Sequence, residues 1–373
     1  MPDGSQTISH THLILVGGFL GAGKTTLLGQ AATHLLRREK TVGLITNDQA
    51  DDLVDTGVLR ELGLTVEEIA GGCLCCRFGQ LIETADALVA AANPDIIFGE
   101  PVGSCTDLSA TVLQPMKDLY GDRFTLTPFS VLVDPDRLWE VLEPRRHSPL
   151  HASARYILRK QLEEADLILL NKVDTLDDAD RAEVLAAAAD AFAGTPVRAM
   201  AARCDIGVAE WLDEVLAGTV AGQHILAVDY DVYAEGEAVL GWLNATASLT
   251  AKRAVDWNAL AVGVLAGIQQ ASAARATEIA HAKVSLQADG GQLVANLTST
   301  GGQIATRGEI IGAPLTATLT INARVEMTPE ALRGIVEQVL RTVVGDAVQV
   351  SITAMHSLSP GRPTPTHRYA AVV

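Results

Sequence analysis

The stretch GFLGAGKT at residues 18–25 is the most informative part of this sequence for predicting the fold. It matches the pattern G-x-x-x-x-G-K-[S/T] and lies between an apolar segment at 12–16 and an amphipathic segment at 25–38. Glycines at this junction let the backbone N–H groups turn inward, and the start of the helix adds partial positive charge. The pattern therefore predicts a phosphate-binding loop, in which Lys24 contacts the β- and γ-phosphates and Thr25 places its hydroxyl on Mg²⁺.

Short apolar segments alternate with longer amphipathic ones on both sides of this loop. We expect strands at 12–18, 41–47, 95–100, 126–134, 165–172 and 195–201 and helices at 25–38, 78–92, 153–164 and 178–191. Such an alternation indicates a mostly parallel sheet with helices on both faces, the α/β fold of a P-loop NTPase domain. The small-residue stretch AGTVAGQ at 217–223 is typical of a linker, so we place this domain at residues 1–220.

Residues 221–373 show a different order of elements. We expect strands at 224–233, 242–250, 279–287, 291–299, 316–326 and 347–358, a helix at 257–274 and a second helix that begins at Thr328 and Pro329. Without the additional strands the order is β-α-β-β-α-β, which predicts a smaller α+β domain with a ferredoxin-like sandwich. The proline-rich tail at 359–373 is expected to be extended.

The composition is that of a globular protein, and its charge is concentrated in the first domain. The net charge is -17, and residues 1–220 hold 33 acidic and 18 basic residues, against 12 and 10 in residues 221–373. Such an acidic field repels nucleic-acid phosphates and anionic lipids, so we expect neither nucleic acid nor a membrane as a partner. We find no run of about 20 apolar residues and no leader-like N-terminus, which predicts a cytoplasmic protein.

A second nucleotide signal is NKVD at residues 171–174, at the end of the strand expected at 165–172. The carboxylate of Asp174 can accept hydrogen bonds from the N1–H and 2-amino groups of guanine, which adenine cannot supply, and this favours GTP and GDP. An ordinary helix cap by Asp174 is the simpler alternative. The residues that we expect to contact the nucleotide are Gly18, Gly21, Ala22, Gly23, Lys24, Thr25, Thr26, Gly103, Asn171, Lys172 and Asp174.

Two segments between these motifs are candidate sensors of the γ-phosphate. In GEPVG at 99–103, Glu100 can hold Mg²⁺ through water and the N–H of Gly103 can contact the phosphate. The loop NDQADDLVD at 47–55 contains Asp48, Asp51 and Asp52, which are further candidates for this role. The alternative is that the segment is simply a solvated acidic loop. We assign hydrolysis to Lys24, Thr25, Glu100 and Asp48, and Mg²⁺ binding to Thr25 and Glu100.

Three of the five cysteines lie together in GGCLCC at 71–76, as Cys73, Cys75 and Cys76. Thiolates are soft ligands for Zn²⁺ or a similar ion, and three of them leave one tetrahedral position open, which suits transfer of the ion. The fourth ligand could be water, a carboxylate from residues 48–52 or a residue of a second subunit. A structural zinc turn and a redox-active thiol pair are alternatives, and we expect Cys105 and Cys204 to be packed small residues.

The chain carries four motifs in the order GGFLGAGKTT, GGCLCC, E-x-x-G and NKVD. On these motifs, residues 12–217 resemble the CobW-type (COG-type P-loop) family of GTPases. That family is related to the urease and hydrogenase nickel-insertion GTPases. The resemblance implies GTP hydrolysis, Zn²⁺ or Co²⁺ at the C-x-C-C motif, delivery to a client metalloprotein or cofactor-synthesis enzyme, and a homodimer as one form of assembly. Hydrolysis should be slow without a partner, because no water-positioning glutamine or arginine finger can be assigned. The His-rich loop of many members is missing here, and only His10 and His12 lie close together.

Two other functions stay open from the sequence. A GTP-dependent conformational activator of an enzyme, for example a corrinoid-dependent one, would use its zinc only structurally. A kinase on the same scaffold is the other, but NKVD and the lack of a signature for a second substrate pocket argue against it. If the protein delivers a metal ion to a client, we expect client specificity to lie in residues 221–373, the part of the chain that matches the family least.

Overall fold

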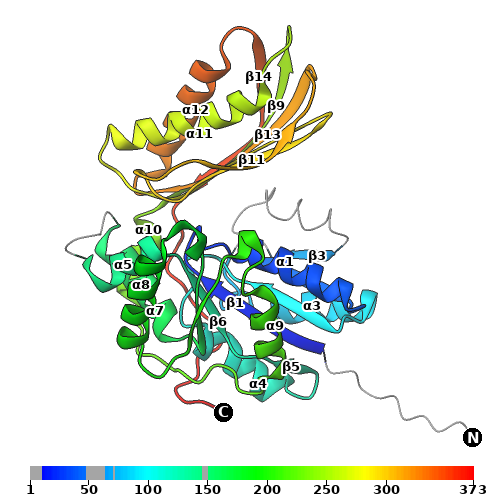
Figure 1. Cartoon of the computed structure of the whole chain (residues 1–373), viewed down its shortest axis with the longest axis vertical. Helices are drawn as coiled ribbons and strands as arrows, with labels where there is room; N and C mark the ends of the chain where they lie inside the picture. The colour runs from blue at the N-terminus through cyan, green and yellow to red at the C-terminus, as the bar shows by residue number, and fades with distance from the viewer. Residues whose placement is uncertain (1–10, 48–63, 70–71, 145–149) are drawn as a thin grey trace, which may run out of the picture.

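The computed structural model describes residues 11–47, 64–69, 72–144 and 150–373. These residues form two separate sheets, one in each half of the chain, and helices pack on both of them (Figure 1). The sheet of the second half lies beyond the end of the first sheet (Figure 1). The described part of the chain contains no helix that is both long and apolar enough to cross a lipid bilayer.

The first sheet has eight strands in the order β3-β2-β4-β1-β6-β7-β8, with β5 paired to β1. Their bounds are β1 Thr11–Gly18, β2 Val42–Asn47, β3 Thr65–Ile69, β4 Ile96–Glu100, β5 Phe124–Leu126, β6 Ser130–Val133, β7 Leu167–Leu170 and β8 Val197–Ala199. The pairs recorded between these strands are parallel, so their carboxyl ends lie at one edge of the sheet. The predicted α/β class is confirmed, although the strand expected at 126–134 is divided into β5 and β6.

Helices cover both faces of this sheet because its strands are buried on both sides. Along β1, Leu13 and Leu15 pack into one core and Ile14 and Val16 into the other, since successive side chains of a strand point to opposite faces. Helices α1 and α9 pack into the second core, and α3, α7 and α10 into the first. The helix bounds are α1 Lys24–Arg37, α3 Phe78–Ala92, α4 Gln114–Tyr120, α5 Pro135–Leu142, α7 Ala152–Glu163, α8 Asp178–Ala191, α9 Val208–Ala217 and α10 Tyr230–Ala238, with short η1 Ser109–Leu113, η2 Val173–Thr175 and η3 Ala202–Cys204.

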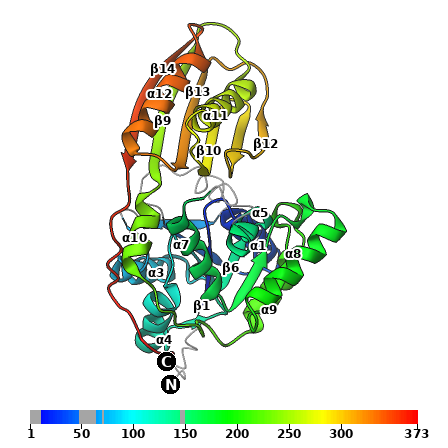
Figure 2. The same ribbon diagram turned by 90° about the vertical axis from the view of Figure 1, so that its left-hand side faces the viewer.

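The second sheet is antiparallel, with the order β12-β11-β10-β13-β9-β14. Its elements are β9 Gly241–Ala251, α11 Trp257–Ala273, β10 Ile279–Ala288, β11 Gly291–Leu297, β12 Ala305–Ile310, β13 Thr316–Val325, α12 Pro329–Val344 and β14 Val348–Leu358. Helices α11 and α12 lie on one face (Figures 1 and 2). Strands β14-β9-β13-β10 have the arrangement of a split β-α-β sandwich, which confirms the ferredoxin-like form, and the hairpin β11–β12 extends the sheet beyond β10.

Two sequence expectations in the second half are wrong. The stretch 224–233 is not a strand: Asp229 accepts hydrogen bonds from the N–H groups of Asp231 and Val232 and starts helix α10. Between the strands expected at 291–299 and 316–326, where no further strand is expected, residues 305–310 form strand β12. Helix α10 packs against α7, where a Cβ on Gly236 would lie 2.5 Å from the carbonyl oxygen of Ser153. The domain boundary at residue 220 stays a prediction.

The tail, residues 359–373, leaves β14 and returns along the first domain without forming a helix or strand (Figure 2). Its backbone is anchored near the end, because the N–H of Tyr369 donates to the carbonyl oxygen of Ala110 at 3.0 Å. The N–H of Val373 donates to the side chain of Gln114 at 2.9 Å. The two ends of the second half are therefore both tied to the first domain, one through α10 and the other through the tail.

Candidate functional site

The phosphate loop has the backbone shape that its glycines predict. Gly18, Gly21 and Gly23 have φ values of 129°, 76° and 102°, in the region that glycine adopts without strain. A Cβ on Gly18 would lie 2.4 Å from the carbonyl oxygen of Leu132, so only glycine fits beside β6. The buried ammonium of Lys24 donates to the carbonyl oxygen of Gly18 at 2.9 Å, and it is thereby held over the loop.

The residues predicted to hold Mg²⁺ lie together. The hydroxyl of Thr25 donates to the two carboxylate oxygens of Glu100 at 2.9 and 3.2 Å. They meet because β1 pairs with β4, so the helix that follows β1 begins beside the end of β4. A hydroxyl and a carboxylate are hard oxygen ligands, and this pair fits Mg²⁺. Gly103 packs on the loop as well, since a Cβ there would lie 3.0 Å from the N of Leu20.

NKVD is attached to the phosphate loop through its first residue. The side chain of Asn171 donates to the carbonyl oxygen of Ala22 at 2.8 Å and accepts from the N–H of Ala202 at 2.9 Å. Lys172 pairs with the buried Asp134 at 2.8 Å. Burial alone would raise the pKa of Asp134, but Lys172 and then Arg137 outweigh it and lower the pKa. Asp174 is exposed on η2.

Thr26 lies in the first turn of α1, beside Thr25. Asp48, Asp51 and Asp52 lie outside the described residues, as does His10. The nucleotide residues that the sequence singled out thus fall into two connected groups, one on the phosphate loop and β4 and the other on β7. Their roles in binding and hydrolysis stay predictions.

The three clustered cysteines form one group of sulfur atoms. The Sγ of Cys73 lies 3.0 Å from that of Cys75 and 3.0 Å from that of Cys76, and the last two are 3.8 Å apart. The three ligand atoms lie within 4.8 Å of one another. Sulfurs on one tetrahedral zinc ion, each at about 2.3 Å, are about 3.8 Å apart, so small side-chain shifts would fit this group to the ion. Cys73 and Cys75 are buried and Cys76 is half-buried.

A fourth thiol, that of Cys105, lies beside this group. Cys105 is buried next to Cys73, outside the group of three sulfur atoms that lie within 4.8 Å of one another. The pKa of Cys73 is lowered because the thiols of Cys105, Cys75 and Cys76 hydrogen-bond to it. The expectation that Cys105 is a packed small residue is therefore incomplete. Cys204, in contrast, is exposed, so the expectation that it is a packed small residue is wrong, and its Sγ lies 3.5 Å from a carboxylate oxygen of Asp174.

The tail passes over the C-x-C-C motif. The N–H of Thr364 donates to the Sγ of Cys76 at 3.2 Å, and the N–H of Thr366 donates to the carbonyl oxygen of Cys75 at 2.9 Å. Arg368 secures this position by pairing with the buried Asp107 at 2.7 Å. The motif is therefore covered by a segment almost three hundred residues further along the chain.

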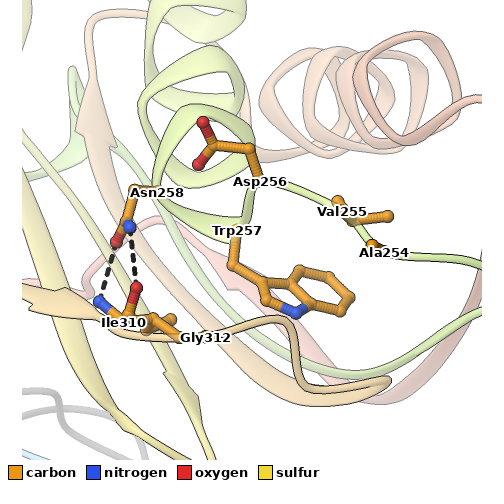
Figure 3. A pocket seen from close by; sticks show the side chains of 7 residues that line it. All are labelled: Ala254, Val255, Asp256, Trp257, Asn258, Ile310 and Gly312. Carbon is orange, nitrogen blue, oxygen red and sulfur yellow. Dashed lines mark hydrogen bonds between the residues drawn. The ribbon is translucent and has the colours of Figure 1, made fainter.

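A hollow in the second domain lies apart from these groups. It is bounded by the segment that leads into α11 and by the end of β12, and Figure 3 shows its residues. The side chain of Asn258 makes two hydrogen bonds with the backbone of Ile310, at 3.0 and 2.9 Å. The N–H of the Trp257 ring donates to the carbonyl oxygen of Pro314 at 2.7 Å. These polar groups already have partners within the protein, so they serve to join α11 to β12.

Comparison with known proteins agrees with this geometry. The chain is 32% identical over 171 residues to the zinc chaperone YeiR of Escherichia coli, covering 44% of this chain and 47% of the relative. It is 29% identical over 221 residues to the zinc chaperone CobW of Pseudomonas aeruginosa, covering 51% and 55%. The chain thus spans about half the length of these curated relatives.

Among solved structures, the Zn(II)-bound YjiA GTPase from E. coli aligns over 88% of this chain and 99% of its own, with 17% identity and a TM-score of 0.39. The family described as CobW/HypB/UreG, nucleotide-binding domain, matches residues 12–196. The resemblance found in the sequence is confirmed. Residues 12–196 of this chain are therefore a nucleotide-binding domain of the CobW/HypB/UreG family.

Proposed function

We propose that this protein is a GTP-hydrolysing metallochaperone that carries Zn²⁺ or Co²⁺ on Cys73, Cys75 and Cys76. The observation that supports this most is the sharing of one sheet edge: β1 runs into the phosphate loop, β4 into Glu100 and Cys105, and β7 into NKVD. In open parallel sheets ligands bind beyond the carboxyl ends of the strands. Cys105 contacts the sulfur cluster, so the nucleotide and metal sites would be neighbours at this edge.

The roles of the nucleotide residues follow from their contacts. Lys24 and the backbone N–H groups of residues 18–25 would bind the phosphates, and its 2.9 Å bond to Gly18 would be exchanged for phosphate oxygens. Thr25 and Glu100 would hold Mg²⁺, which neutralises charge on the phosphate oxygens. Asp174 would select guanine over adenine, and Asp48, which lies outside the described residues, stays a predicted contributor to hydrolysis.

The metal ion in this proposal is cargo. The zinc chaperones among the curated relatives favour Zn²⁺, and the soft sulfur donors suit that ion. Cys76 is the least buried of the three cysteines, so we place the exchange of the ion there. The recipient would be a client metalloprotein or a cofactor-synthesis enzyme in the cytoplasm, and the homodimer stays a prediction.

One observation favours the second candidate, a conformational activator with a structural zinc. Cys73 and Cys75 are buried, and the tail donates an N–H to Cys76, an enclosure that would also suit a permanent ion. The two functions differ in what happens to the ion. A structural ion would stay on the chain through repeated GTP turnover in the presence of a zinc acceptor, whereas cargo would leave it.

The proposed function is tested by substituting Lys24 and measuring both GTP turnover and zinc affinity. We expect Lys24→Met to lower turnover at least about 1000-fold, which is about 4 kcal/mol, because the phosphates lose their principal cation. Zinc should still bind, but its affinity should no longer differ between GDP and a non-hydrolysable GTP analogue. Phosphate release and competition with a zinc chelator measure the two quantities.

The matched control is Lys40→Met, which removes a lysine paired with Asp95 at the surface. An exposed pair contributes little, so both quantities should equal those of the unaltered chain. Normal turnover in Lys24→Met would refute the phosphate site. Equal zinc affinities of the unaltered chain with GDP and with the GTP analogue would refute the coupling on which a GTP-dependent chaperone relies.

A further inference from the structure

The segment at residues 100–107, which follows β4, is fixed at its first end to the nucleotide site. Glu100 accepts the hydrogen bond from Thr25 at 2.9 Å, in the predicted Mg²⁺ site. Gly103 lies directly against the phosphate loop, where a Cβ would come within 2.8 Å of the Leu20 side chain. A phosphate or Mg²⁺ that displaces these contacts must therefore act on this segment.

The same segment reaches the sulfur cluster two residues later. Cys105 has an exposed fraction of 2% and lies next to Cys73, just outside the group of three sulfur atoms. The side chain of Gln161 donates to the carbonyl oxygens of both Gly103 and Cys105, at 3.0 and 2.7 Å. Gln161 thereby fixes the glycine at the phosphate loop and the cysteine at the sulfur cluster in one arrangement.

The cluster needs one more ligand than its motif supplies. A tetrahedral ion takes four, and the C-x-C-C motif provides three. Cys105 already contacts Cys73, it is a soft donor like the other three, and its burial disfavours water in its place. We propose that Cys105 is the fourth thiol ligand of the metal site and that, as part of the 100–107 segment, it makes the metal affinity depend on the bound nucleotide.

A carboxylate is the main competitor for this fourth position. Glu237 of α10 is buried nearby, and burial raises its pKa to about 8. The hydroxyl of Ser104 donates to it at 2.6 Å, so one of its oxygens is already engaged. A carboxylate is also a harder ligand than a thiolate, which favours Cys105 for an ion that three sulfurs already bind. The two candidates predict different spectra for bound Co²⁺.

The test uses Co²⁺, whose thiolate bonds give charge-transfer absorption, on the full chain. Cys105→Ser should lower that absorption per bound ion by about one quarter, because three thiolates remain where four were bound. The affinity for Co²⁺ should fall about tenfold or more. Cys204→Ser is the matched control, since Cys204 is the exposed cysteine outside the cluster, and it should change neither quantity.

Cys105→Ala tests the same ligand without placing a hydroxyl in a buried position, and retained GTP binding shows that either variant is folded. In the unaltered chain the Co²⁺ affinity should differ between GDP and a non-hydrolysable GTP analogue, and both Cys105 variants should bring the ratio of the two affinities close to one. Unchanged absorption in both variants would overturn the proposal, and so would a fall in Co²⁺ affinity in Glu237→Gln that neither Cys105 variant shows.

The inference rests on the proposed function, and the outcomes separate the two. If the unaltered chain shows no thiolate absorption with Co²⁺, the metal site itself is refuted, and Cys105 with it. If the unaltered chain shows absorption that Cys73→Ser reduces and Cys105→Ser leaves intact, the C-x-C-C site stands and only the assignment of Cys105 fails.

Discussion

The two halves of the molecule hold their buried ionisable side chains in different places. The core of the second half consists mostly of aliphatic residues of its antiparallel sheet and two helices. In the first half, ionisable groups such as Lys24, Asp107, Asp134 and Glu164 are buried as well, and the second half buries Lys283 and Arg324 on strands β10 and β13 and Glu278 directly before β10. A buried charge costs stability unless it is paired, so a domain retains such groups where they serve a site. The comparison places the buried groups that have a proposed chemical role in the first half, although the second half buries charged groups as well.

The two halves meet at one buried arginine. Arg137 of α5 has an exposed fraction of 3% and lies between Glu140 of its own helix and Glu278 of the second half. It also donates to the carbonyl oxygen of Ile279 at 3.0 Å and to that of Thr298. The side chain of Thr298 in turn lies against Gly21, where a Cβ would come within 2.6 Å of it. The second half therefore contacts the phosphate loop itself.

The largest effect on stability is expected from Arg137→Met. The substitution leaves Glu140 and Glu278 buried without their common partner, which should cost about 3 to 5 kcal/mol of unfolding free energy. Urea denaturation measures it. Arg333→Met is the matched control, because Arg333 pairs with Glu337 at the surface and its loss should cost less than about 1 kcal/mol. Equal midpoints for the two variants would show that this arginine does not hold the halves together.

The second prediction locates a pH dependence of stability in the first half. Burial raises the pKa of Glu164 to about 8, from an ordinary value of 4.5. Between these two values the unfolded chain releases the proton and the folded chain retains it, so stability is highest at low pH and is lost as the pH rises. The loss from this group is about 1.4 kcal/mol per pH unit within that window.

Glu164→Gln removes this titration. From pH 6 to pH 7.5, the decrease in unfolding free energy should therefore be about 2 kcal/mol smaller in this variant than in the unaltered chain. Glu163→Gln makes the same change of charge beside Lys160 at a more exposed position and should keep the original pH dependence. Urea denaturation at the two pH values gives the comparison. Parallel curves for the unaltered chain and Glu164→Gln would show that Glu164 is ionised in the folded protein.

Features that depend on neighbouring residues could be predicted from the sequence. The phosphate loop and NKVD carry their geometry in a few consecutive residues, and the order of strands and helices determined both fold classes. Helix α10 was missed because the apolar pattern at 224–233 concealed the cap at Asp229. The role of Cys105 and the position of the tail depend on contacts distant in the chain, such as Thr364 to Cys76 at a separation of 288 residues, which no local pattern encodes.

The smallest effect on stability is expected from Arg368→Ala, and it tests to which half the tail belongs. Arg368 is partly exposed and bonds to the buried Asp107 and to the carbonyl oxygen of Leu226, so its loss should cost about 1 kcal/mol. Its main effect should be local, because the tail that covers Cys76 would detach more often. Metal-free protein should then react several-fold faster with a thiol reagent at Cys76.

Arg362→Ala is the control for this experiment, since Arg362 pairs with Asp231 where both side chains are largely exposed, and it should leave the reaction rate unchanged. Equal rates for the two variants would mean that the tail stays on the motif without its arginine, held by the backbone bonds of Thr364 and Thr366. A faster rate in Arg368→Ala alone would make the tail part of the metal site. In the sequence the tail continues the second half of the chain. By its contacts it would then belong to the first half, which contains the C-x-C-C motif.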